Sequence, residues 1–155
     1  MKTFKSFFIL FLASLFILSV NSCKKSGSEE ELGPHNKVRT AQGFDEYITA
    51  QGANLQLLDF RAEADFIAGH IPNAVNIPAT VVNTASDNGE FAQQVLQRFD
   101  KTRPLFIYGG SDLNLEYIVP GRISKIGFGQ PNTYILLGGF NVWKTEFPGK
   151  IETGK

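Results

Sequence analysis

Short apolar runs alternate along this chain with segments in which apolar residues recur at helical spacing. Four short, mainly apolar runs predict strands: Leu55 to Phe60, Ala74 to Ile77, Leu105 to Tyr108 and Thr133 to Leu137. Strands that are separated by helical segments favour a sheet of parallel strands. The pattern therefore predicts an α/β domain in which a central, mostly parallel sheet is flanked by helices.

The helical segments between these runs have recognisable starts and ends. Thr40 is a suitable N-cap for a helix that continues to about Thr49, with Phe44, Tyr47 and Ile48 on one face. The other predicted helices cover residues 62–68, 90–99, the segment from the loop after residue 108 to about residue 126, and 140–147.

Two of these helices carry further signals. The helix at 90–99 follows a turn at Ser86 to Gly89, and its apolar positions at helical spacing are Phe91, Val95, Leu96 and Phe99. Pro120 is expected to kink the helix that follows residue 108, unless that helix begins there.

The first residues have the features of an export signal. Lys2 and Lys5 precede an apolar run from Phe7 to Val20, which is shorter than the roughly 20 residues that cross a bilayer. The run ends in Val20-Asn21-Ser22-Cys23, which resembles a bacterial lipobox, the motif at which a cysteine is lipidated and becomes the new N-terminus. We therefore expect Cys23 to attach the protein to a membrane.

This interpretation divides the chain into three parts. They are a lipoprotein signal peptide at residues 1–22, a flexible polar tether at 23–36 and a domain at 37–150. The expected location is the bacterial cell envelope, on the periplasmic or the surface-facing side of a membrane. The alternatives are an uncleaved anchor and ordinary cleavage that leaves Cys23 with a free thiol.

Composition excludes several kinds of chemistry. Cys23 is the only cysteine, so no intramolecular disulfide can form, and lipidation would consume the one thiol. The 15 basic and 15 acidic side chains balance, and no basic cluster along the sequence suggests binding to nucleic acid. We expect no nucleic-acid partner, no metal site and no cofactor.

The segment from Leu57 to Pro78 is the most informative part of the sequence. A strand ends with Asp59 and Arg61, which lie two residues apart and therefore on the same side of the pleat. A histidine, His70, follows in a turn before the next strand. Asp59 and Arg61 are interpreted mainly as a structural polar network, and His70 as a residue that bonds the backbone rather than a general base.

Together with a second motif near the end of the chain, this segment resembles the rhodanese-like domain family. The first motif comprises Asp59, Arg61, Asp65, Gly69, His70, Ile71, Pro72, Ala74, Asn76, Ile77 and Pro78, and the second comprises Gly127, Phe128, Gly138, Gly139 and Trp143. The resemblance extends from Val38 to Phe147. It implies an α/β fold and, in active members, a sulfurtransferase whose loop cysteine takes sulfur from a donor such as thiosulfate.

The chain departs from the family at the position of that cysteine. The resemblance places it directly after the strand that ends at Tyr108, at Gly109 or Gly110, and neither residue carries a thiol. A basic residue that commonly follows five positions later is replaced by Asn114 or Leu115. The loop remains a candidate for binding an anion through backbone N–H groups. Its residues are Gly109, Gly110, Ser111, Asp112, Leu113 and Asn114.

Three hypotheses follow from the sequence. The first is a lipid-anchored, catalytically silent domain that binds a protein partner or a small oxyanion. The second is a sulfurtransferase whose thiol is supplied from elsewhere, for example by an unlipidated Cys23. The third is different chemistry at Ser111, Asp112 or His70, although capping of the following helix explains Ser111 or Asp112 more simply.

Overall fold

The computed structural model describes residues 37–78, 89–111 and 113–155. The predicted signal peptide and tether, most of the predicted turn before residue 90, and Asp112 lie outside the described residues. Within the described part of the chain, no helix is both long enough and apolar enough to cross a membrane.

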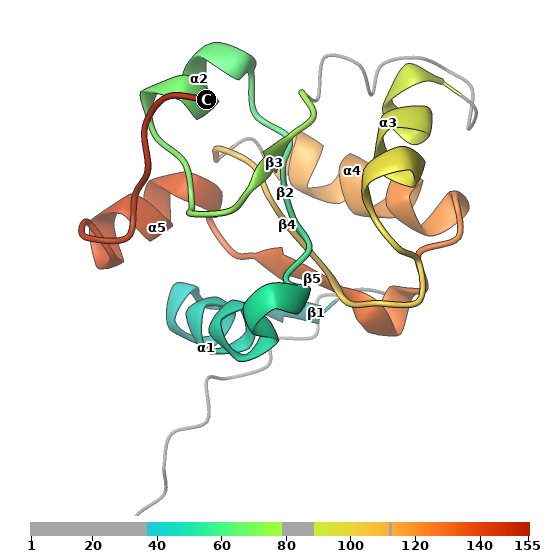
Figure 1. Cartoon of the computed structure of the whole chain (residues 1–155), viewed down its shortest axis with the longest axis horizontal. Coiled ribbons are helices and arrows are strands. Elements are labelled where there is room, and N and C mark those ends of the chain that lie inside the picture. Colours follow the sequence, from blue (N-terminus) through green and yellow to red (C-terminus); the bar gives the residue numbers. More distant parts are fainter. Residues whose placement is uncertain (1–36, 79–88, 112) are drawn as a thin grey trace, which may run out of the picture.

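A five-stranded sheet forms the centre of the domain (Figure 1). Its strands are β1 (Lys37–Arg39), β2 (Leu57–Asp59), β3 (Val75–Asn76), β4 (Leu105–Tyr108) and β5 (Thr133–Leu136). They are arranged in the order β1-β5-β4-β2-β3, and every neighbouring pair is parallel. The predicted fold class is confirmed.

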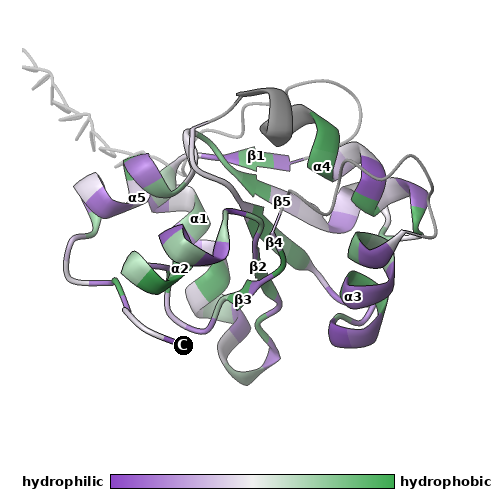
Figure 2. Cartoon of the chain, turned by 90° about the horizontal axis from the view of Figure 1, so that it is seen from above, coloured by the Kyte–Doolittle hydropathy of each residue, from purple (hydrophilic) through white to green (hydrophobic). Residues whose placement is uncertain are grey.

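The described residues form five α-helices. They are α1 (Ala41–Gln51), α2 (Glu63–Ala68), α3 (Glu90–Arg98), α4 (Leu113–Lys125) and α5 (Gly139–Glu146). Of these, α1, α3, α4 and α5 pack on the sheet. Short 3-10 turns at Gly52–Asn54 and Gln130–Asn132 lead into β2 and β5. Helices α1 and α5 lie on one side of the sheet, and α3 and α4 lie on the other (Figure 2).

Strands β2, β4 and β5 are buried at every position, as expected for a parallel sheet between two helical layers. In β4, Leu105 and Ile107 belong to the core beneath α3 and α4, whereas Phe106 and Tyr108 belong to the core beneath α1 and α5. This alternation is the two-residue repeat of an extended strand. It explains why the strand is apolar at every position.

Local signals placed most helix ends correctly. Thr40 caps α1, because its hydroxyl oxygen accepts a hydrogen bond from the Gly43 N–H at 3.2 Å. Gly69 directly follows the last residue of α2, where its N–H donates to the carbonyl oxygens of Asp65 and Phe66.

Other details differ from the sequence prediction. Strand β1 was not predicted, because three residues are too few to show a periodic pattern. Tyr47 and Leu96 were placed on buried helix faces but are 37% and 42% exposed. Pro120 lies inside α4 rather than at its start, in a helix that runs from Leu113 to Lys125.

Candidate functional site

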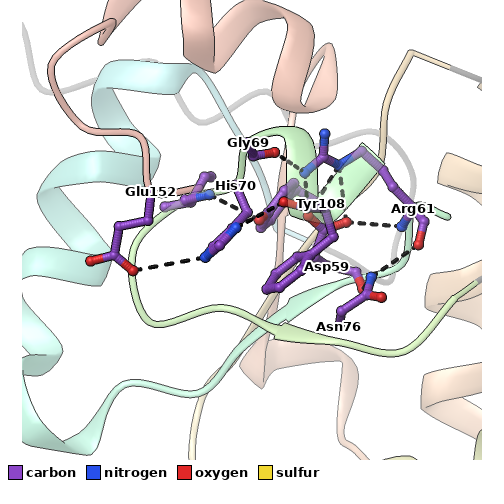
Figure 3. Close-up of polar contacts among 9 residues, drawn as sticks. Asp59, Arg61, Gly69, His70, Asn76, Tyr108 and Glu152 are labelled. Carbon is purple, nitrogen blue, oxygen red and sulfur yellow. Dashed lines mark hydrogen bonds and ion pairs between the residues drawn. The ribbon is translucent and has the colours of Figure 1, made fainter. Parts of the chain in front are cut away.

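The site predicted from sequence lies where β2 and β4 end side by side, with Asp59 paired in register with Tyr108. The Arg61 guanidinium donates through Nε to both oxygens of Asp59 at 3.0 Å and through Nη2 to Oδ2 at 2.5 Å (Figure 3). The two side chains are 8% and 0% exposed. The positive charge of Arg61 is therefore largely compensated inside the protein.

The Asp59–Arg61 pair also ties neighbouring backbone segments together. Arg61 Nη2 donates to the Gly69 carbonyl at 2.7 Å. The Asn76 amide donates to the carbonyl oxygens of Asp59 and Arg61 at 3.0 and 2.9 Å (Figure 3). These contacts join the end of β2, the turn after α2 and β3. They give the spaced polar residues of the motif a structural explanation.

Tyr108 is the polar centre of this network, although the sequence did not single it out. The Ile71 N–H donates to its phenolic oxygen at 3.1 Å. Burial, followed by the adjacent Asp59 carboxylate, raises the pKa of Tyr108 far above its ordinary range, so the phenol remains neutral. The alternation of β4 could have identified it, because a tyrosine in a fully buried strand needs a hydrogen-bond partner.

His70 is buried beside this network and is held by its neighbours. Its Nδ1 lies 2.9 Å from the Phe66 carbonyl oxygen, so this nitrogen is the protonated donor. The ring stacks on Phe66 with centroids 3.8 Å apart, and Nε2 faces the Glu152 carboxylate at 3.8 Å. This placement suits a residue that fastens the turn to the C-terminal segment.

The loop after β4 begins with Gly109, which is buried against Phe60. A Cβ atom at Gly109 would lie 2.4 Å from Phe60 Cε2 and 2.5 Å from Cζ, closer than side chains approach each other. Phe60 is 1% exposed and belongs to the core. At Gly110 the nearest atom to an added Cβ is Arg61 Cδ at 4.0 Å. Of the two positions proposed for the missing thiol, only Gly110 has room for a side chain.

The same loop rests against the start of α5. Gly139 has φ +58°, and a Cβ there would lie 2.0 Å from the Gly110 carbonyl oxygen and 2.5 Å from that of Gly109. The Phe140 N–H donates to the Gly109 carbonyl at 2.8 Å. The second glycine of the Gly138-Gly139 motif is therefore required by both backbone conformation and close contact.

This docking also sets the direction of the loop amides. The described peptide bonds include no cis bond, and in a trans peptide the N–H points opposite to the C=O. Because the carbonyls of Gly109 and Gly110 face α5, the N–H groups of Gly110 and Ser111 point away from it. No hydrogen bond within the described residues uses either N–H.

A depression of about 550 Å³ lies beside this loop. Its described lining residues are Arg61, Asp65, Ala68, Gly69, Gly110, Ser111, Phe140, Asn141, Lys144 and Ile151. Asn141, Lys144 and Ile151 were not anticipated, because they come from α5 and from the segment after it. His70 and Pro72 are not among the lining residues, and Pro72 instead borders a second depression beside α1.

The charges around the depression nearly cancel. Arg61 is paired with Asp59, and it also lies over the Phe140 ring at 4.0 Å. The exposed Asp65 offsets the exposed Lys144. The loop could hold a small polar group, but the described lining contains no thiol and no serine that is hydrogen-bonded to a base. Leu113 and Asn114 begin α4, and their side chains lie outside the description.

In the described part of the chain, no group of three or more histidine, cysteine or carboxylate residues is placed so that it could hold a metal ion.

Comparison with known proteins places this arrangement in context. The family model of the rhodanese-like domain matches residues 40–146. Among solved structures, the BH2092 protein from Bacillus halodurans is 21% identical with a TM-score of 0.57, covering 74% of each chain. The Alr3790 protein from Anabaena sp. has the same identity and TM-score, covering 74% of this chain and 80% of its own. A protein from Lactobacillus plantarum is 20% identical with a TM-score of 0.51, covering 70% and 84%. No curated protein matches the chain.

Proposed function

The chain belongs to the rhodanese-like domain family, and we propose that it is a member without sulfurtransferase activity, anchored to a membrane by a lipid on Cys23. In this proposal the domain is a binding module for a protein partner or a small oxyanion. The alternative remains a sulfurtransferase that uses a thiol supplied from elsewhere.

The main support for the proposal is that Phe60 fills the space that a side chain at position 109 would occupy. Sulfur transfer needs a thiolate, and the single cysteine of the chain is Cys23, in the predicted tether. Phe60 occupies the volume that a side chain at Gly109 would need, with contacts of 2.4 and 2.5 Å to an added Cβ. Gly109 therefore has a neighbour, Phe60, that leaves no room for a nucleophilic side chain at this position.

The electrostatics of the depression support the same proposal. A sulfane-sulfur donor such as thiosulfate carries two negative charges, and a catalytic site would have to compensate them. Arg61 is committed to Asp59, with both side chains almost fully buried. The remaining cation of the described lining, Lys144, is exposed, and the same lining also carries the exposed carboxylate of Asp65. This near-balance of charge is more consistent with weak binding of an anion at the N–H groups of Gly110 and Ser111 than with catalytic turnover of thiosulfate.

Thiosulfate:cyanide sulfurtransferase assays test the proposal. We expect no thiocyanate from the natural chain. In Gly110→Cys, the new thiolate can attack the sulfane sulfur of thiosulfate, break the S–S bond and release sulfite, after which cyanide removes the persulfide sulfur. We therefore expect a persulfide that is detectable by mass spectrometry, with turnover well below that of an evolved enzyme.

Gly109→Cys is the matched comparison, because it adds the same thiol one residue earlier. We expect lower stability and no persulfide, since Phe60 fills the required space. Turnover by the natural chain would overturn the proposal. A stable and active Gly109→Cys variant would remove its structural basis.

The anchor and the ligand need separate measurements. Mass spectrometry of the purified protein should find a diacylglyceryl group on Cys23, and Cys23→Ser should leave the membrane fraction. Titration with thiosulfate, sulfate or phosphate should shift the NMR signals of the Gly110 and Ser111 N–H groups. If none of these anions shifts them, the anion proposal fails and a protein partner remains.

A further inference from the structure

The edge of the sheet opposite the candidate site is basic. In a parallel sheet all strands begin at one edge and end at the other, and the helices between them run in the opposite direction. The starts of β1, β4 and β5 therefore share an edge with the segments that leave α3 and α4. The turn before β5 contacts β1, and the link between α3 and β4 lies on the same, lower side of the domain in Figure 1.

Four cations from distant parts of the sequence lie on segments that reach this edge, which we call the basic edge: Lys37 at the start of β1, Lys101 and Arg103 in the link before β4, and Lys125 at the end of α4. Lys37 begins β1 and lies over the Tyr134 ring at 5.3 Å. The Lys101 side chain lies beside Gly127, with Nζ 3.3 Å from the position of an added Cβ. Arg103 donates to the carbonyl oxygen of Asn54, in the turn before β2.

Little negative charge opposes these cations. Among the described residues of this edge, Asp100 is the one carboxylate. Its oxygen accepts hydrogen bonds from the N–H and hydroxyl of Thr102, and its charge also interacts with that of Arg103. Arg61, Lys150 and Lys155 form ion pairs with Asp59, Asp45 and Glu63, and none of these three cations belongs to the basic edge. The remaining described carboxylates lie on α1, α2 and α5, at the ends of β2 and the start of α3, and after α5.

We propose that the basic edge contacts anionic phospholipid headgroups, so that the domain lies on the membrane with its candidate binding loop facing outward. This inference rests on the proposed lipid anchor at Cys23. The tether joins the domain at Lys37, on the basic edge itself, and residues 23–36 can span at most about 50 Å. The acyl chains on Cys23 would hold the protein at the membrane, and a basic surface would add electrostatic attraction to anionic lipids, which orients the domain.

The test uses the full lipidated protein on vesicles of zwitterionic phosphatidylcholine, with or without added phosphatidylglycerol as the anionic lipid. Fluorescent labels are placed at two exposed alanines, through Ala53→Cys at the basic edge and Ala64→Cys on α2. We expect anionic vesicles to protect the label at position 53 from an aqueous quencher and to leave the label at position 64 unchanged. Salt at 1 M should abolish the protection, because the Debye length falls to about 3 Å.

Charge variants identify the surface. Replacing both Lys101 and Lys125 with glutamine should lower the ratio of docked to undocked protein by about tenfold or more. Lys144→Gln removes a cation from the opposite side and should leave docking unchanged.

Two outcomes would overturn the basic edge as a membrane surface. One is that the label at position 53 is protected from the quencher equally on zwitterionic and anionic vesicles. The other is that the labels at positions 53 and 64 are protected equally. Flotation of the protein with purely zwitterionic vesicles depends on the lipid anchor alone. If the protein does not float with these vesicles, the proposed lipid anchor is overturned, separately from the basic edge.

Discussion

At the scale of single residues, the site is built from polar groups that satisfy one another. Asp59, Arg61 and Tyr108 are each almost fully buried, and each bonds to at least one partner from another segment. A buried charge is tolerated when it is paired and hydrogen-bonded, as Asp59 is by Arg61. The motif residues therefore contribute to folding around the loop, independently of any reaction.

Tyr108 gives this network a predictable pH dependence. Its folded pKa is raised above the ordinary value of 10.0, so its contribution to stability is complete below pH 10 and is lost as the pH rises further. We expect Tyr108→Phe to lower the free energy of unfolding by about 1–3 kcal/mol at neutral pH, because the Ile71 N–H loses its acceptor. Above pH 10 the difference between variant and parent should shrink, as measured by urea unfolding. Tyr47→Phe, at an exposed position, is the control, and a difference independent of pH would contradict the assignment.

At the scale of elements, the loop after β4 is shaped by α5. Gly109 and Gly110 direct their carbonyl oxygens toward Gly139, and the Phe140 N–H completes the contact. A glycine pair at the start of α5 and a glycine pair after β4 thus meet backbone to backbone. The packing requirement extends across both motifs, although they are far apart in the sequence.

Gly139→Ala tests this packing. The added methyl group would lie 2.0 Å from the Gly110 oxygen and would have to adopt φ +58°, so we expect a loss of at least about 2 kcal/mol in the free energy of unfolding. NMR signals of residues 109–111 should shift as the loop moves. Gly149→Ala, with no atom within 4 Å of the new Cβ, should change stability by less than about 0.5 kcal/mol. Similar stability of the two variants would show that the contact is loose.

At the scale of the whole molecule, the C-terminal segment joins parts of the domain that are distant in sequence. Glu152 exchanges two backbone hydrogen bonds of 2.9 Å with His70, and the Gly154 N–H donates to Ile67 at 2.9 Å. Ile151 lines the depression beside the loop. This segment lies beyond the residues that the family model matches, and it runs from α5 to α2 in Figure 1.

Deleting residues 151–155 should therefore destabilise the domain. Loss of the three backbone hydrogen bonds and of the Ile151 contacts should cost about 2–4 kcal/mol, measured by urea unfolding. Amide exchange at His70 should become faster. Glu152→Gln keeps the backbone bonds and replaces only an exposed carboxylate that lies 3.8 Å from His70 Nε2, so it should have little effect. An unchanged midpoint for the shortened chain would mean that the segment is only loosely attached.

The sequence by itself determined the parallel α/β fold, the cap at Thr40, the stop at Gly69 and the absence of a thiol after β4. These features depend on local patterns, on residue types and on motifs that can be read along the chain. The tertiary structure alone decided that Phe60 closes position 109, that α5 supplies Lys144 to the depression, and that four scattered cations share one edge. Each of these depends on contacts between residues far apart in the chain, which strand order and packing bring together.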